Sequence, residues 1–160
     1  MLFQSPGKIP FVLTNDGTSF LYRSRNGCMA MIDMETFKTH NIIEDKFMQK
    51  VEFISYCKEG ILFYVWPEAV QSSSGSQWTY NLEVYNIKLE RPQCNAKLSF
   101  SNVRLKDMRE MIDQHSLLLY SKGEKLCIVA VDHLLQLKAK VELQVDDKTD
   151  NPCTHIGMPN

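Results

Sequence analysis

The histidines of this chain could act as metal ligands or catalytic bases, but they are scattered. A zinc or catalytic site needs several groups that converge on one point. His133 directly follows Asp132, yet no histidine has a partner at the spacing of metal ligands. We expect solvent-exposed loop histidines and no metal site at His40, His115, His133 and His155.

The cysteines do not have the pattern of a disulfide framework. Their number is odd, no two have CxxC spacing, and the chain contains no Asn-x-Ser/Thr glycosylation site. Cys28 and Cys127 could be nucleophiles only beside a base, and their apolar context favours packed thiols. Free thiols are typical of reducing compartments, which predicts a cytoplasmic or nuclear location. The five cysteines are Cys28, Cys57, Cys94, Cys127 and Cys153.

An acidic group, Asp146, Asp147 and Asp150, lies late in the chain. A calcium loop would need oxygen ligands at alternate positions and a glycine bend, so a solvated turn is the favoured interpretation. The sequence also lacks GxxxxGKS/T, GxGxxG, HExxH and GxSxG, which are common signatures of phosphate-binding loops and hydrolases. We predict no catalytic residues, no cofactor and no metal, and therefore no enzyme.

Aromatic and methionine residues indicate a binding surface. Trp66 and Trp78 flank a serine-rich segment, and Tyr80 follows closely. Exposed Trp and Tyr beside a loop are favoured anchors at protein interfaces, although both tryptophans could instead fill the space between packed sheets. Met108 and Met111 belong to an amphipathic segment that would either cover a sheet or dock on another protein. These five residues are the candidate partner-binding set.

Composition is that of an ordinary globular domain. Of the 160 residues, 44% are hydrophobic and 23% charged, and the formal net charge is −1. Such a balance creates no field that would attract nucleic acid or an anionic membrane. The apolar runs are far shorter than the ~20 residues that a membrane helix needs. We expect neither nucleic-acid binding nor membrane binding.

The elements that must position these residues recur three times. Apolar runs that carry Tyr22, Tyr64 and Tyr120 are each followed by a second run that ends in Asp or Asn, and then by a weaker third run. A four-stranded unit that repeats every ~40–45 residues is typical of a β-propeller blade. The sequence therefore predicts an all-β fold of antiparallel four-stranded blades, which form a partial or fragmentary β-propeller.

Turn residues set the expected boundaries. Asn15-Asp16-Gly17 and Arg25-Asn26-Gly27 are tight-turn sequences that indicate a meander at the start of the chain. We predict an N-terminal extension at 1–9, blade-like repeats at about 10–45, 50–100 and 103–145, and a C-terminal tail or start of a further blade at 146–160. In this register Val131 faces inward and Glu83 faces outward.

Two segments interrupt the repeats. The polar stretch at 71–76 predicts an exposed loop, because it combines serine and glycine with no apolar residue. The segment at 101–113 is ambiguous: Leu105, Met108 and Met111 have the spacing of one helix face, and Ser101 or Asn102 could cap a helix. A short helix near 103–113 and a distorted strand are both compatible with this pattern.

With its repeats aligned, the chain resembles the WD40-like β-propeller superfamily across roughly 10–145. Third strands in that superfamily normally end in an aromatic or aliphatic residue followed by Asp or Asn. Ile32-Asp33, Tyr85-Asn86 and Val131-Asp132 occupy this position here. The Gly-His and Trp-Asp pairs of regular repeats do not occur, so the resemblance is to a degenerate form.

The number of repeats bears on function. A propeller needs ~4–8 blades to close its ring, and three are visible. This favours part of a larger propeller over an open ring completed by a partner, or a different all-β fold with the same period. We expect a non-enzymatic protein–protein interaction scaffold that binds other protein subunits, with self-association through open blade edges as a further option. The alternative is a small-ligand-binding or enzymatic propeller domain with a central channel, which mainly apolar inner strands argue against.

Overall fold

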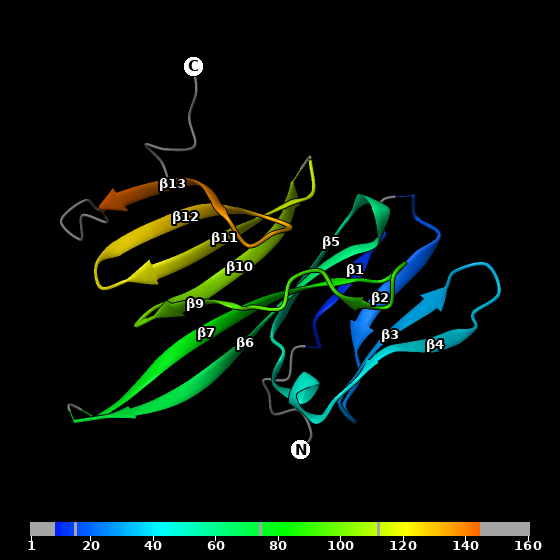
Figure 1. The fold of residues 1–160 in the computed structure, drawn as a ribbon, viewed down its shortest axis with the longest axis horizontal. Coiled ribbons are helices and arrows are strands. Elements are labelled where there is room, and N and C mark those ends of the chain that lie inside the picture. The colour runs from blue at the N-terminus through cyan, green and yellow to red at the C-terminus, as the bar shows by residue number, and fades with distance from the viewer. Residues whose placement is uncertain (1–8, 15, 74, 112, 145–160) are drawn as a thin grey trace, which may run out of the picture.

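The chain folds into β-sheets with very little helix (Figure 1). The computed structural model describes residues 9–14, 16–73, 75–111 and 113–144, and their strands form three antiparallel sheets. The predicted all-β fold class is confirmed, and the arrangement fits a partial β-propeller. The predicted tail at 146–160 lies outside the described residues, as does all but residue 9 of the predicted N-terminal extension.

The first sheet is a meander in the order β1-β2-β3-β4. Glycines allow its tight turns: Gly17 and Gly27 have φ angles of 72° and 90°, which other residues adopt only with strain. A short 3-10 helix, η1 (Lys46–Lys50), leads to the second sheet. The strands are β1 (Phe11–Leu13), β2 (Ser19–Arg23), β3 (Cys28–Asp33) and β4 (Thr39–Glu44).

The second sheet contains a long hairpin that projects beyond the other strands (Figure 1). Its two strands are paired as far as Ser72, which lies opposite Gly75. The prediction of a loop at 71–76 is therefore wrong. Strand preference depends strongly on context, so the serines and glycine of this stretch do not prevent the ladder from continuing. The elements are β5 (Phe53–Cys57), η2 (Lys58–Gly60), β6 (Ile61–Ser72), β7 (Gly75–Asn86), β8 (Arg91–Pro92) and β9 (Leu98–Ser101).

The third sheet has the order β10-β11-β12-β13. The helix considered near 103–113 is wrong, because this segment is a strand with a register shift between Leu105 and Asp107. A β-bulge adds one residue, so Leu105 and Met108 fall on the same face despite a spacing of three. The strands are β10 (Arg104–Met111), β11 (His115–Lys122), β12 (Lys125–Asp132) and β13 (Leu137–Gln144).

The sheets are joined by two hydrophobic cores that meet at β6. The first core, between the first and second sheets, contains Leu21 and Met29 of the first sheet. The second core, between the second and third sheets, contains Leu118 and Val129 of the third sheet. Side chains of a strand alternate between its faces, so β6 contributes to both cores: Leu62, Tyr64 and Trp66 to the first, and Ile61, Phe63 and Val65 to the second.

The predicted register holds at Val131 but not at Glu83. Val131 is fully buried in the second core, as expected. Glu83 is half-buried on the face toward the first sheet, where its Oε2 accepts a hydrogen bond of 2.6 Å from the hydroxyl of Tyr64. Burial and this carboxylate together raise the pKa of Tyr64. Glu83 therefore accepts a hydrogen bond from a buried hydroxyl and does not face solvent freely.

The Asp or Asn that ends each third strand has one shared role. Its side-chain oxygen accepts backbone N–H groups of the following turn, at 2.9–3.0 Å, which is the geometry that favours Asx turns. The repeated sequence position is therefore a turn cap, present in every sheet. The donors are Glu35 and Thr36 for Asp33, Leu89 for Asn86, and Leu134 and Gln136 for Asp132.

Acidification should weaken the cap at Asp132. Its burial acts to raise the pKa, but hydrogen bonds from Gln136 and Leu134 and the ion pair with Lys138 outweigh that effect and lower it. A lowered folded-state pKa gives stability that is present above the unfolded pKa and is lost as pH falls through the folded value. We expect Asp132→Ala to cost on the order of 1 kcal/mol at pH 7 and much less at pH 2, measured by urea unfolding.

The control is Asp132→Asn, since Asn86 already fills the equivalent position in the second sheet. This variant keeps an acceptor oxygen without the charge, so its stability at pH 7 should lie between those of the wild type and Asp132→Ala and should change less with pH than that of the wild type. Equal losses for Asp132→Ala at pH 7 and pH 2 would contradict the role of the carboxylate.

A charge reversal at Glu83 should destabilise the fold. Glu83→Lys would leave the buried Tyr64 hydroxyl without its acceptor, which costs about 1–3 kcal/mol. Glu124→Lys, in the exposed turn between β11 and β12, is the matched control and should change the unfolding free energy by less than about 0.5 kcal/mol. Similar unfolding midpoints for the two variants would show that the Tyr64 contact contributes nothing.

Candidate partner-binding groove

The candidate binding residues do not form one surface. Trp66 is 8% exposed and packs in the first core against Phe47 and Tyr64, with ring centroids 4.9 and 6.0 Å apart. Met108 is buried in the second core. Met111 ends β10 and is partly exposed. Trp66 and Met108 thus pack between sheets, which was the alternative to a role in partner binding.

Trp78 is the most exposed member of the set, with 56% of its surface accessible. It lies on β7 opposite Ala69 of β6, at the base of the projecting part of the hairpin. Tyr80, two residues along the same strand, is half-buried and packs against the second core. The sequence context is the same for both tryptophans, but the structure separates them, since Trp66 is buried and Trp78 is exposed.

A groove of about 930 Å³ runs beside Trp78. Trp78, Pro67 and Ala69 form its hairpin wall, and Phe53 adds an apolar side chain from β5. A smaller hollow of about 160 Å³ shares Trp78 and Pro67 and reaches Tyr80. The indole ring therefore stands between two hollows, one of them large enough for several side chains of a partner.

Charged side chains at the groove come from distant segments. Burial raises the pKa of Glu52, against the lowering effect of a Tyr80 hydrogen bond and of Arg23. Burial lowers the pKa of Arg23, against the effect of Glu52, and the Arg23 Nε donates to the Val51 carbonyl at 3.2 Å. Lys50 and Glu68 also line the groove. An apolar wall with charges of both signs can recognise a polypeptide by packing and by hydrogen bonds.

Sequence reasoning missed Arg23, Glu52 and Lys50 as parts of a site. They lie on β2 and on the segment around η1, and no short motif connects these segments with Trp78. Pro67 offered the one usable signal, because proline in a strand indicates an edge without a ladder donor. β5 begins opposite Val65, so Pro67 lies just beyond the end of that pairing.

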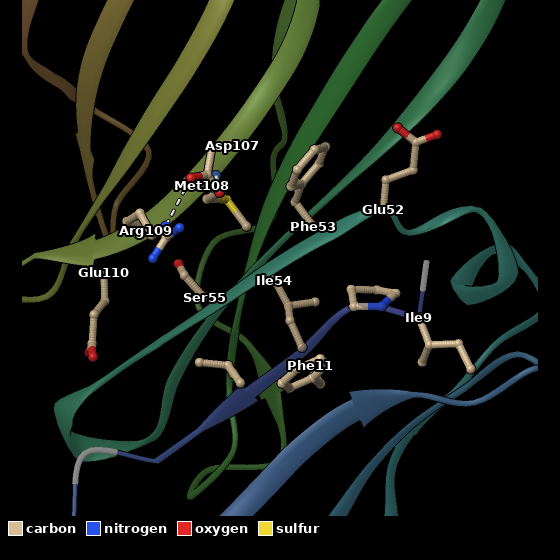
Figure 2. Close-up of a pocket in the computed structure, with 12 residues that line it drawn as sticks. Ile9, Phe11, Glu52, Phe53, Ile54, Ser55, Asp107, Met108, Arg109 and Glu110 are labelled. Carbon is tan, nitrogen blue, oxygen red and sulfur yellow. Dashed lines mark hydrogen bonds and ion pairs between the residues drawn. The ribbon is translucent and has the colours of Figure 1, made fainter. Parts of the chain in front are cut away.

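A second groove, of about 840 Å³, follows the inner strands β1, β5 and β10 (Figure 2). These strands carry more charge than expected, including Asp107, Arg109 and Glu110. Asp107 pairs with Arg109 at 2.9 Å, and the Ser55 hydroxyl lies 3.0 Å from that of Ser116. Among these lining residues no nucleophile is paired with a base.

Other candidate groups are spread over the molecule. His40 lies on β4, His115 on β11 and His133 in the turn before β13, so two of the expected loop histidines are strand residues. Within the described residues, no three His, Cys, Asp or Glu side chains are grouped so that they could hold a metal ion. Nor does any helix in this part have the length and apolarity to cross a bilayer. His155, Cys153 and the acidic group at 146–150 lie outside the described residues.

The chain matches no protein-family model and no curated protein sequence. Among solved structures it is similar to an acylaminoacyl peptidase of Pyrococcus horikoshii, with 10% identity and a TM-score of 0.46, over 78% of this chain and 28% of that one. It is also similar to U3-55K, with 8% identity and a TM-score of 0.47, over 89% of this chain and 54% of that one. The chain thus spans about half or less of each structure's length.

The thiol of Cys57 should react slowly in the folded protein. Burial, together with the nearby Glu110, raises its pKa to about 11, and the Cys57 thiol donates to the His115 carbonyl at 3.3 Å. A rise of two units lowers the thiolate fraction roughly 100-fold at pH 8. We expect iodoacetamide to modify Cys57 at least about tenfold more slowly than in urea-unfolded protein. Equal rates, measured by mass spectrometry, would contradict a packed thiol.

Proposed function

We propose that this chain is a non-enzymatic protein–protein interaction scaffold, the β-propeller portion of a larger protein or a multi-subunit complex. The exposed Trp78 beside its groove is the observation that carries the proposal. A tryptophan side chain has few rotatable bonds and so loses little conformational freedom on binding, which makes it a good anchor. The expected partners are other protein subunits in the cytoplasm or nucleus.

A small-ligand-binding or enzymatic role is the second candidate. The inner-strand groove favours it, because Asp107, Arg109 and Glu110 bring charge to a concave surface (Figure 2). Asp107 and Arg109 form a solvent-exposed ion pair, and no nucleophile among the lining residues is paired with a base, so the groove gives this alternative little support. A scaffold is therefore the better supported of the two functions.

The test is affinity purification of partners from an extract of cells that express the protein. Wild-type chain should recover a reproducible set of proteins, and Trp78→Ala should lose them, because its indole contributes most of the apolar contact. Leu89→Ala is the matched control, because Leu89 is also 56% exposed and lies outside the groove. Retention of the whole set by Trp78→Ala would overturn the assignment of the groove.

A further inference from the structure

The third sheet has a face that none of the described elements covers, apolar on β11 to β13 but charged at β10, where Asp107 and Arg109 lie opposite Leu119 and Leu117. β13 alternates Lys138, Lys140 and Glu142 with Ala139, Val141 and Leu143. Val141 lies opposite Ile128, which lies opposite Leu119, and residues directly opposite in a sheet share a face. This is the side away from the second core, which we call the front face, and Val141 is 51% exposed on it.

The first sheet has a complementary exposed face. Leu21 and Val12 point to the first core, so their strand neighbours point the other way, onto what we call the back face. Phe11 and Phe20 stack there with centroids 5.1 Å apart. Leu13, opposite Phe20, is 51% exposed. This face is mainly aromatic and apolar.

The three tyrosines of the repeat relate these two faces to the existing cores. Tyr64 packs on the back face of the second sheet against the first sheet, within the first core. Tyr120 packs on the back face of the third sheet against the second, within the second core. Tyr22 lies on the back face of the first sheet, opposite Phe11. In both cores, the back face of one sheet is covered by the front face of the sheet before it. The back face of the first sheet is equivalent to these covered faces but is exposed.

We propose that a second copy of this chain covers both faces, with the front face of each third sheet packed on the back face of the other copy's first sheet. This deepens the proposed interaction role, on which it rests, by naming one partner and its surface. Two such head-to-tail contacts close a ring of six sheets, which is within the ~4–8 blades that propellers use. A net charge of −1 on each copy gives little repulsion between them.

Area favours the closed arrangement over a single contact. Four strands ~4.8 Å apart and ~6 residues long cover a face of roughly 400 Å². One contact would bury about 800 Å² in total, which is within the range of adventitious crystal contacts, whereas two contacts bury about 1,600 Å², the size of a standard stable interface. The dimer is therefore expected to depend on both faces at once.

Light scattering of the purified chain over a range of concentrations tests this proposal. Wild-type protein should show twice the monomer mass. Val141→Glu on the front face and Leu13→Glu on the back face should each raise the dimer Kd by roughly two orders of magnitude or more, because a charge would be buried without a partner. Both positions are half exposed in one copy, so each variant should fold, and Leu89→Glu is the control that stays dimeric.

A mixture of the two variants makes the test sharper. In a heterodimer of the two variants, one contact would join the two changed faces and the second contact would join two unchanged faces. The mixture should therefore form a weak heterodimer, although neither variant dimerises alone. Loss of the dimer with Val141→Glu alone would indicate front-to-front pairing and overturn the proposal. A monomeric wild type at several hundred micromolar, or open-ended polymers, would also overturn it, while partner recovery that depends on Trp78 would leave the scaffold function standing.

Discussion

The burial of β6 on both faces is the constraint on which the rest of the structure depends. Its six residues from Ile61 to Trp66 are all buried, and each is an apolar or aromatic side chain whose burial contributes about 1.5–3 kcal/mol. A strand of this kind needs a cover on each side, as parallel-sheet strands do in other folds. The first and third sheets are these covers, so the stacking of three sheets follows from one strand.

The same logic accounts for what remains exposed. The outer sheets each use one face to cover β6 and present the other to solvent, where Phe11 and Val141 lie. The hairpin beyond Val65 extends past β5, which leaves Trp78 beside a groove rather than in a core. The binding surfaces proposed for a partner and for a second copy thus both arise where the sheets stop covering one another.

Much of the fold was predictable because its signals are local. Turn sequences with Gly17 and Gly27 located the first hairpins, and the residues at Asp33, Asn86 and Asp132 marked a turn cap that needs only nearby backbone donors. The strand at β10 was ambiguous because a bulge gives Leu105 and Met108 a helical spacing. Such a shift is defined by pairing with β11, which local sequence does not encode.

The candidate site was predictable only in part. Trp66 is buried and Trp78 is exposed because the pairing of β5 with β6 stops at Val65. The position of this boundary is a tertiary feature. The charged side chains of the groove, Arg23 and Glu52, come from β2 and from the segment before β5, and these segments have no common motif. Glu83 was expected to face solvent because strand alternation was read without the first sheet that covers its face.

Native-state hydrogen exchange of the β6 amides is the most direct measurement of the central claim. If β6 is the strand on which both cores depend, the amides from Ile61 to Val65 should exchange only through global unfolding and be the slowest in the chain. The exposed edge strand β13 should exchange much faster. Exchange of β6 at the rate of β13, with β3 or β12 still protected, would show that the outer sheets are stable without it and would contradict the account.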